Sequence, residues 1–253
     1  MRTIVSLTSH QPRFSMLHHC LQSLYSQTGK VHKIILYLDK GVKHEQLTRE
    51  TLYFQDKGLD IIITDKFLGP HAKYYFAMQQ YPDDIIITVD DDVRYDSMLI
   101  DKLMHSYYRF PMAVSAMRTH KMVLQDNGKI KNYANWDFEY TKILVPSFQL
   151  FATGVGGVLY PPGCMCREVF NESVLMGFCL YADDIWLKIM QLISGTQTVY
   201  VDGMSFPIKT IEYTQDCALY KYNLHGGGND VCINRLIEYY DINLKKLFSE
   251  EVQ

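Results

Sequence analysis

The chain lacks the features that would assign it at once to a nucleic-acid-binding or membrane-spanning class. Its 253 residues include 25 Lys and Arg against 28 Asp and Glu, a formal net charge of −3, so the basic excess that grips a polyphosphate backbone is missing. No apolar run approaches the roughly 18 residues of a membrane span. Met1–Val5 has no secretory-signal pattern. We therefore expect a soluble, cytoplasmic protein, with peripheral contact at the inner face of the plasma membrane left open.

Cysteine is sparse and shows no metal-binding or redox pattern. The six cysteines form no pair of C-x-x-C units. Cys164 and Cys166 flank one residue, but no neighbouring partners complete a zinc site. We expect free, mostly buried thiols. With 47% hydrophobic residues, a chain of this length can build its core without disulfides.

The first ninety residues alternate apolar runs with segments of helical spacing. Helical spacing is seen over Phe14–Tyr25 and Lys73–Gln80, and helical character around 44–55. Strands that are apolar throughout and alternate with helices are typical of a mostly parallel sheet covered on both faces. The pattern predicts an α/β fold whose first part is of a nucleotide-binding type. The predicted strands are Thr3–Thr8, Lys33–Leu38, Asp60–Thr64 and Ile85–Val89.

The rest of the chain is less regular. A polar, aromatic stretch over Lys121–Thr141 and a glycine-rich turn over Gly154–Pro162 interrupt it. No repeat or low-complexity linker occurs, so we predict one domain over 1–253, with 1–95 as the nucleotide-binding half. The remaining predicted elements are helices over Ser97–Tyr108, Asp183–Ile193 and Asp230–Phe248, and strands over Met112–Met117 and Thr198–Val201.

Three carboxylates follow the fourth apolar run directly: Asp90, Asp91 and Asp92. Ligands of open α/β sheets bind beyond the carboxyl ends of the strands, and three adjacent carboxylates repel one another unless a cation compensates. In an extended chain, Asp90 and Asp92 point to the same side and present hard oxygen ligands to Mg²⁺ or Mn²⁺. The alternative is a solvated acidic turn.

Six blocks of sequence, in collinear order, resemble the bacterial glycosyltransferases of the A-type fold (GT-A) related to family 2. That resemblance implies a GT-A fold and metal-dependent transfer of a sugar, with residues 96–253 as the acceptor-binding half. The blocks are Val5–Arg13, Lys33–Leu38, Leu68–Tyr75, Thr88–Val93, Gly156–Pro162 and Ala182–Leu187.

The resemblance also implies roles for single residues. Asp90 and Asp92 match the D-x-D motif that approaches the ribose and holds the metal, with Asp91 between them in the donor site. Asp184 is the first choice for the catalytic base and Asp183 the second, although both can simply cap a helix. The other donor-site positions implied are Thr8, Ser9, Arg13 and Lys73.

Three further segments supply weaker candidates. His225 matches a C-terminal histidine that completes the metal site in several GT-A enzymes, and Asn229 and Asp230 follow it; the alternative is a capped turn or a lid. Gly156 and Gly157 match a segment that borders the cleft, or form a tight turn only. We predict Trp136 in the acceptor site and Trp186 in the core.

The reaction expected from the resemblance is transfer from a nucleotide-sugar, with a UDP-sugar as the expected donor, to a glycan or lipid-linked acceptor. An inverting hexosyltransferase of cell-surface polysaccharide, lipopolysaccharide or glycoprotein-glycan synthesis fits best. One alternative is a metal-dependent nucleotidyltransferase, although the segment Ser6–Pro12 is a poor match to its glycine-rich basic loop. The other is a lapsed glycosyltransferase that serves as a carbohydrate-binding subunit. The sequence does not indicate the oligomeric state.

Overall fold

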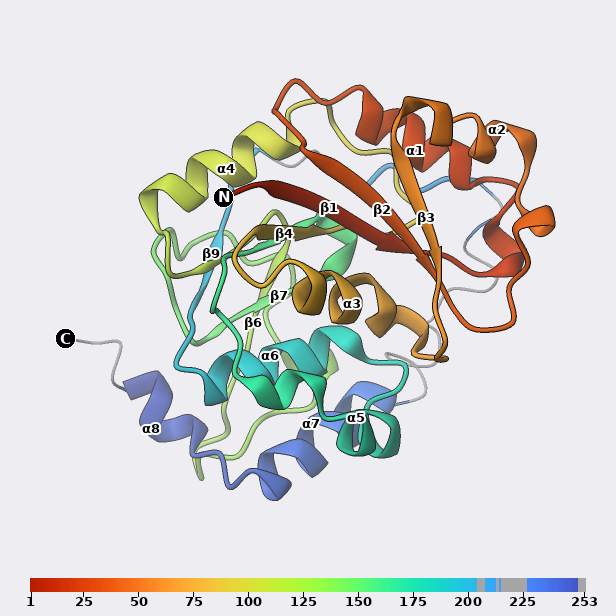
Figure 1. Ribbon diagram of the computed structural model, residues 1–253. Coiled ribbons are helices and arrows are strands. Elements are labelled where there is room, and N and C mark those ends of the chain that lie inside the picture. Colours follow the sequence, from red (N-terminus) through yellow and green to blue (C-terminus); the bar gives the residue numbers. More distant parts are fainter. Residues whose placement is uncertain (204–207, 213, 215–226, 250–253) are drawn as a thin grey trace.

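The four apolar segments of the first ninety residues form the parallel half of the central sheet, as the sequence predicts. β1 (Thr3–Thr8) pairs with β2 (Lys33–Leu38) and β4 (Ile85–Thr88), and β2 pairs with β3 (Leu59–Ile63), all in parallel. The central strand β1 is buried on both faces, which explains why it is apolar rather than alternating. The computed structural model describes residues 1–203, 208–212, 214 and 227–249 (Figure 1).

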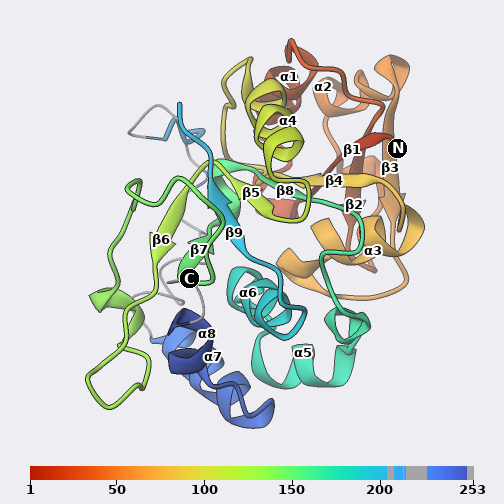
Figure 2. The same ribbon diagram turned by 90° about the vertical axis from the view of Figure 1, so that its left-hand side faces the viewer.

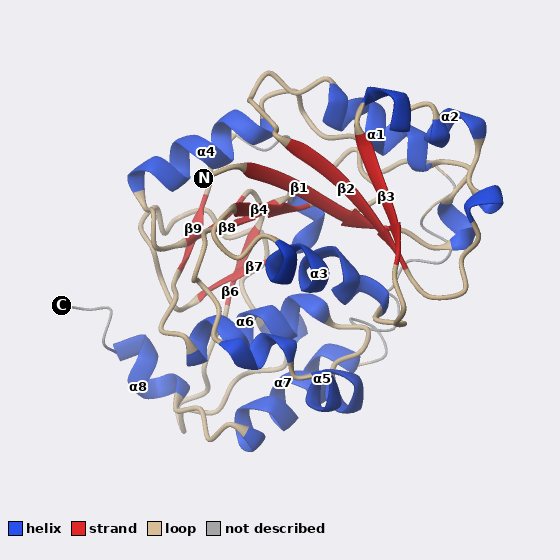
Figure 3. Ribbon diagram, in the orientation of Figure 1, coloured by secondary structure: helices blue, strands red, loops and turns tan. Residues whose placement is uncertain are grey.

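Three shorter strands extend this sheet beyond β4. β8 (Val158–Tyr160) pairs antiparallel with both β4 and β5 (Val114–Ala116), and β5 pairs in parallel with β9 (Thr198–Tyr200). The strand order is β3-β2-β1-β4-β8-β5-β9 (Figure 3). β8 falls inside the segment that the sequence predicts as a glycine-rich turn, of which 154–156 form a short 3-10 helix. The predicted α/β fold with a mostly parallel central sheet is confirmed.

Helices cover both faces of the sheet and define two hydrophobic cores (Figure 2). On one face, α1 (Leu17–Tyr25) and α4 (Leu99–Arg109) pack with the β1 residues Val5 and Leu7, beside the short α2 (Arg49–Leu52). On the other face, Ile4 belongs to a core that includes α3 (Ala72–Gln80) and α6 (Asp183–Ile193). Alternate residues of one strand thus enter different cores.

The helix α6 is buried over almost its whole circumference, so its position is fixed by packing. Trp186 is fully buried, and its Nε1–H donates to the carbonyl of Val169 at 3.0 Å. The prediction of a core role for Trp186 is confirmed. α5 (Glu172–Phe178) and α7 (Gly228–Tyr239) lie alongside. Because α6 is rigid, the acidic pair at its start has a defined direction.

The predicted terminal helix is in fact two helices, α7 and α8 (Leu244–Ser249). Asp241 adopts a left-handed conformation with φ 50°. The N–H of Ile242 donates to the carbonyl of Ile237, and that of Asp241 to Glu238. This pair of backbone hydrogen bonds is typical of helix C-termini. The apolar periodicity of the sequence continues beyond the break and so conceals it. Among the described helices, none is long and apolar enough to cross a membrane.

Two short strands on either side of the polar, aromatic stretch form a second, two-stranded sheet that is not predicted from the sequence. β6 (Thr119–Lys121) pairs antiparallel with β7 (Leu150–Ala152). Trp136, predicted in the acceptor site, is instead a core residue: it is buried, its Nε1–H donates to the carbonyl of Lys131 at 2.9 Å, and its ring packs on Phe151. The correction follows from the indole N–H, which finds its partner in the local backbone.

We predict that Gly157→Ala lowers the free energy of unfolding by about 1–3 kcal/mol. Gly157 has φ +89°, and an added Cβ would lie 3.0 Å from Leu99 Cδ1. The control is Gly177→Ala in α5, where a Cβ meets nothing within 4 Å and helix propensity favours alanine by about 1 kcal/mol. Urea unfolding measures both variants, and equal stability of the two would contradict the structural role of Gly157.

Candidate functional site

A pocket of about 650 Å³ lies at the carboxyl ends of β1, β2 and β4, between the two halves of the chain. This is the place where open α/β sheets bind ligands. The structure brings together there most of the residues that the sequence singles out. Those lining the pocket are Thr8, Ser9, Arg13, Lys73, Asp90, Asp91, Asp92, Asp183, Asp184 and Asn229.

One guanidinium holds two of the three consecutive aspartates. Arg13 follows β1 on a short 3-10 turn; its Nη1 lies 2.6 Å from Asp91 Oδ1, and its Nη2 3.0 Å from Asp92 Oδ2. Ser9 Oγ donates to Asp91 Oδ2 at 2.5 Å. These charge-assisted contacts offset the repulsion between neighbouring carboxylates.

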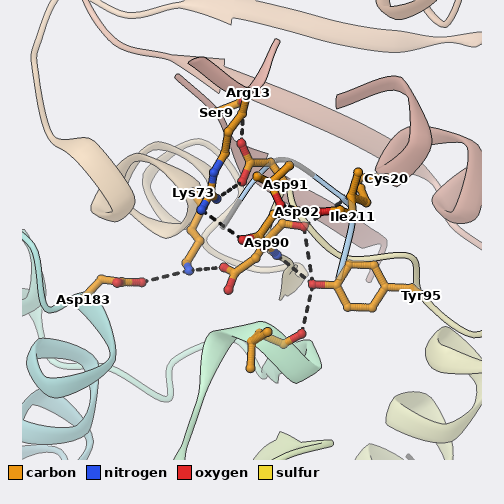
Figure 4. Close-up of polar contacts among 12 residues, drawn as sticks. Ser9, Arg13, Cys20, Lys73, Asp90, Asp91, Asp92, Tyr95, Asp183 and Ile211 are labelled. Atoms are coloured by element: carbon orange, nitrogen blue, oxygen red, sulfur yellow. Dashed lines mark hydrogen bonds and ion pairs between the residues drawn. The ribbon is translucent and has the colours of Figure 1, made fainter. Parts of the chain in front are cut away.

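The buried ammonium of Lys73 links the remaining aspartate to the start of α6 (Figure 4). Its Nζ lies 2.6 Å from Asp90 Oδ1 and 2.9 Å from Asp183 Oδ2, and its side chain is only 6% exposed. Burial opposes the charge, but Asp183, Asp90 and Asp184 together raise the pKa of Lys73 well above its usual value. Lys73 is therefore a permanent cation at the centre of the site.

The pKa values of the two acidic residues at the start of α6 are shifted in opposite directions. Burial raises the pKa of Asp184 to about 8, and the neighbouring charge of Asp183 adds to this effect. Burial acts on Asp183 as well, but Lys73 and His71 outweigh it and lower the pKa of Asp183. Paired carboxyls whose pKa values are pushed apart are typical of acid–base sites.

Backbone geometry fixes the direction of Asp184. The N–H of Gly154 lies 3.1 Å from each carboxylate oxygen of Asp184. A Cβ on Gly154 would come within 2.9 Å of Lys73 Nζ and 3.3 Å of Asp90 Oδ1. Only glycine allows this close approach of the backbone to the charged groups.

The three aspartates do not alternate along an extended strand as the sequence reasoning assumes. β4 ends at Thr88 and the chain turns at 91–92, so Asp91 and Asp92 share Arg13 while Asp90 reaches Lys73. Tyr95 holds this turn: its hydroxyl accepts from the backbone N–H of Asp90 at 2.8 Å. The turn thus splits the carboxylates between two cations.

Several sequence candidates lie away from the pocket or outside the described residues. Gly156 and Gly157 do not line it, since the turn presents Thr153 and Val155 instead. Asp230 accepts a hydrogen bond from the backbone N–H of Tyr133 at 2.6 Å and so anchors a loop. His225 falls outside the described residues.

Other polar residues line the pocket beside those predicted from the sequence. Asp39 follows β2 directly, and its carboxylate accepts from the N–H groups of Leu68 and Gly69 at 2.9 and 3.2 Å. Its place after an apolar strand is the same signal that marks Asp90. Arg118 and His120 also line the pocket, but no motif in the sequence distinguishes them.

The site offers ligands suited in chemistry to a divalent cation. Asp90, with 27% of its side chain exposed, and Asp92 present carboxylate oxygens beside the pocket. Mg²⁺ commonly takes one or two such carboxylates and completes its shell with water and phosphate. Within the described part of the chain, no group of three or more His, Cys, Asp or Glu is preformed around a metal position.

Known proteins resemble this chain in structure but not in sequence. No family model matches the chain, and no curated protein matches it. The structure of CMP:2-keto-3-deoxy-manno-octonic acid synthetase in complex with CTP matches with a TM-score of 0.52 at 13% identity, over 89% of this chain and 99% of that one.

Two further structures match to the same degree. Mannosyltransferase PcManGT from Pyrobaculum calidifontis, in complex with GDP-Man and Mn²⁺, gives a TM-score of 0.51 at 12% identity over 87% of this chain and 59% of that one. The structure of S. aureus TarS 1–349 gives a TM-score of 0.51 at 11% identity, over 100% of this chain and 76% of that one. These likenesses show a GT-A-like α/β fold, without singling out family 2.

We predict opposite effects on stability for Asp184→Asn and Asp183→Asn. The pKa of Asp184 rises from 3.8 to about 8 on folding, so its ionisation costs stability as pH climbs through that interval. Asp184→Asn removes this cost and should raise Tm by several degrees at about pH 8.5, with the gain fading toward about pH 4.

Asp183 is the matched control at the neighbouring position. Its lowered pKa means that its charge stabilises the fold above the unfolded pKa, and this contribution is lost as pH falls through the folded pKa. Asp183→Asn should therefore lower Tm at neutral pH. Calorimetry in the presence of a chelator measures both, and shifts of the same sign would contradict the assigned electrostatics.

Proposed function

We propose that this chain is a glycosyltransferase that uses a nucleotide-sugar donor and acts with inversion. The observation that carries the proposal is the single charged network in which Lys73 joins Asp90, at the end of a sheet strand, to the acidic pair opening α6. The GT-A-like fold supports it. When an acceptor hydroxyl displaces a nucleoside diphosphate at an anomeric carbon, the groups that bind the donor and the base that serves the acceptor must lie close together, as they do in this network.

At the nucleotide end, the pocket pairs polar side chains with two fixed cations. Thr8, Ser9 and Asp39 would contact the nucleoside, and Arg13 and Lys73 would face the diphosphate. Asp90 and Asp92 would hold a Mn²⁺ or Mg²⁺ ion, which when bound neutralises charge on the diphosphate. Lys73 stays protonated and stabilises the negative charge that develops as the nucleoside diphosphate leaves.

At the other end, Asp184 would act as the general base. Its raised pKa makes the carboxylate a strong acceptor for the proton of an attacking hydroxyl. The Gly154 N–H keeps the carboxylate aimed at the pocket. The acceptor oxygen bonds to the anomeric carbon, the bond to the diphosphate breaks, and the proton ends on Asp184.

A second candidate is a nucleotidyltransferase that joins a nucleotide to a sugar. The observation in its favour is the match to the CMP:2-keto-3-deoxy-manno-octonic acid synthetase, which spans 99% of that enzyme. The products separate the two reactions: a nucleotidyltransferase releases pyrophosphate from a nucleoside triphosphate. A glycosyltransferase releases a nucleoside diphosphate from a nucleotide-sugar. A lapsed enzyme releases neither.

Metal-dependent nucleotide binding is the first expected result. Calorimetric titration with UDP, GDP and CDP, each with and without Mn²⁺, should show one nucleotide that binds more tightly with the metal. Asp92→Asn should remove the metal-dependent part, at least about tenfold in affinity. The control Asp60→Asn alters a partly exposed ion pair with Lys33 on the sheet edge and should leave binding unchanged. No nucleotide binding by folded protein would overturn the proposal.

The second expected result is a loss of sugar transfer without a loss of donor binding. Asp184→Asn should lower the rate of nucleoside diphosphate release in the presence of acceptor by about 10²–10⁴-fold, the usual contribution of a general base. Nucleotide affinity should stay near that of the native protein, and Asp60→Asn is again the control. Transfer at a near-normal rate by Asp184→Asn would exclude Asp184 as the base.

A further inference from the structure

Arg118 is a pocket cation that the proposed chemistry does not use. It follows β5 and lines the pocket with a side chain 20% exposed. Its Nη1 donates to Thr153 Oγ1 at 3.2 Å, while its acidic partner, Glu139, lies 3.3 Å away with 48% of its side chain exposed. Partly exposed pairs of this kind are weak and readily exchanged.

The other two pocket cations are committed to largely buried carboxylates. Arg13 is held by Asp91 and Asp92, and Lys73 by Asp90 and Asp183. A ligand anion competing for Arg118 displaces only a solvated carboxylate. Among these three cations, Arg118 is thus the one that an incoming anion can engage at least cost.

A continuous series of contacts sets the place of Arg118 relative to the chemistry. Lys73 contacts Asp90 and Asp183, the neighbouring Asp184 accepts from the N–H of Gly154, and the adjacent Thr153 contacts Arg118. Asp90, at the proposed nucleotide end, lies at one end of this series and Arg118 at the other. The proposed base therefore stands between the diphosphate site and Arg118.

Aromatic rings form the pocket wall beside Arg118. Phe138 lies with its ring centroid 4.4 Å from His120 and 5.5 Å from Tyr133, and Phe151 lies 5.8 Å from Tyr133. Phe138 is 41% exposed although it lines the pocket. The Nδ1 of His120 accepts from the backbone N–H of Glu139 at 3.1 Å, so the imidazole is neutral and holds this wall in place. A ring face can pack here while an anion reaches Arg118.

We propose that Arg118 binds a carboxylate or phosphate group of the acceptor, so that the acceptor is an acidic saccharide or a phosphorylated polyol and not a neutral sugar. The inference rests on the proposed glycosyltransferase function and names the substrate class of the same pocket. Arg118 recognises the anion with two parallel N–H groups. The aromatic wall supports the ring or chain that carries the anion, and the attacking hydroxyl then lies toward Asp184.

The test compares matched anionic and neutral probes by NMR titration of the protein saturated with Mg²⁺ and the nucleoside diphosphate that it binds. The pairs are methyl β-D-glucuronide against methyl β-D-glucoside, and glycerol 3-phosphate against glycerol. At least one anion should bind about tenfold more tightly than its neutral partner, and the pair that discriminates identifies carboxylate or phosphate.

Variants of Arg118 assign the effect to this side chain. Arg118→Gln should abolish the discrimination and Arg118→Lys should restore it in part, because lysine keeps the charge but not the planar fork. Arg109→Gln, an exposed arginine at the end of α4, should behave as the native protein. Nucleotide affinity, measured in the same samples, shows that the proposed function and the fold are intact.

Three results would overturn the inference while leaving nucleotide binding untouched. They are equal binding of charged and neutral probes, no binding of either anion, and discrimination that survives Arg118→Gln. A fourth result would also overturn it: if UDP-glucuronate bound more tightly than UDP-glucose and Arg118→Gln removed the difference, Arg118 would bind an anionic group of the donor sugar and not of the acceptor. Absence of nucleotide binding, in contrast, would mark failure of the proposed function itself.

Discussion

The organisation of the site depends on a buried ammonium. Lys73 stands between a carboxylate that follows a sheet strand and one that opens a helix, and burying its charge would be prohibitive without them. Each member of the network needs the others: without Lys73, Asp90 and Asp183 would face each other as unpaired charges. Glycine at position 154 is required because the backbone must come close enough to bind Asp184 directly. Electrostatic balance therefore dictates backbone shape here.

The two hydrophobic cores explain how such a network stays fixed. The strand that leads into Ser9 and Arg13 is buried on both faces, and the helix that supplies Asp183 and Asp184 is packed around nearly its whole surface. Neither element can shift to relieve repulsion among the carboxylates. The charges must be balanced where they stand: Arg13 and Lys73 each pair with two carboxylates, and Asp184 accepts from the Gly154 N–H instead. A rigid frame of this kind is suited to a polar ligand, because little reorganisation is needed on binding.

The sequence predicts the fold well where a local pattern decides it. β1, β2 and α6 match their predicted ranges residue for residue, because continuous apolar runs and an acidic helix start are local signals. The break at Asp241 comes from local hydrogen bonds at a non-glycine residue, which the continuing apolar periodicity conceals. The antiparallel β8 and the packing of Trp136 on Phe151 depend on tertiary contacts that no local pattern encodes. In the site, the sequence predicts the aspartates that follow a strand or open a helix. It does not predict Arg118 or the charge partners of each aspartate, because these come from distant parts of the chain.

The antiparallel course of β8 has a consequence for how such a protein can diversify. A strand that runs against its neighbours enters the sheet at the edge where they leave it, so the segment before β8 lies among the strand ends of the site. Changes of length directly after Tyr160 fall at the opposite edge, away from these strand ends. The loop between β6 and β7 contacts Arg118 through Glu139, and Arg118 in turn contacts Thr153, which follows β7 and precedes Gly154. Evolution can therefore rewrite that loop, and with it the accepted substrate, while the reaction itself is inherited unchanged.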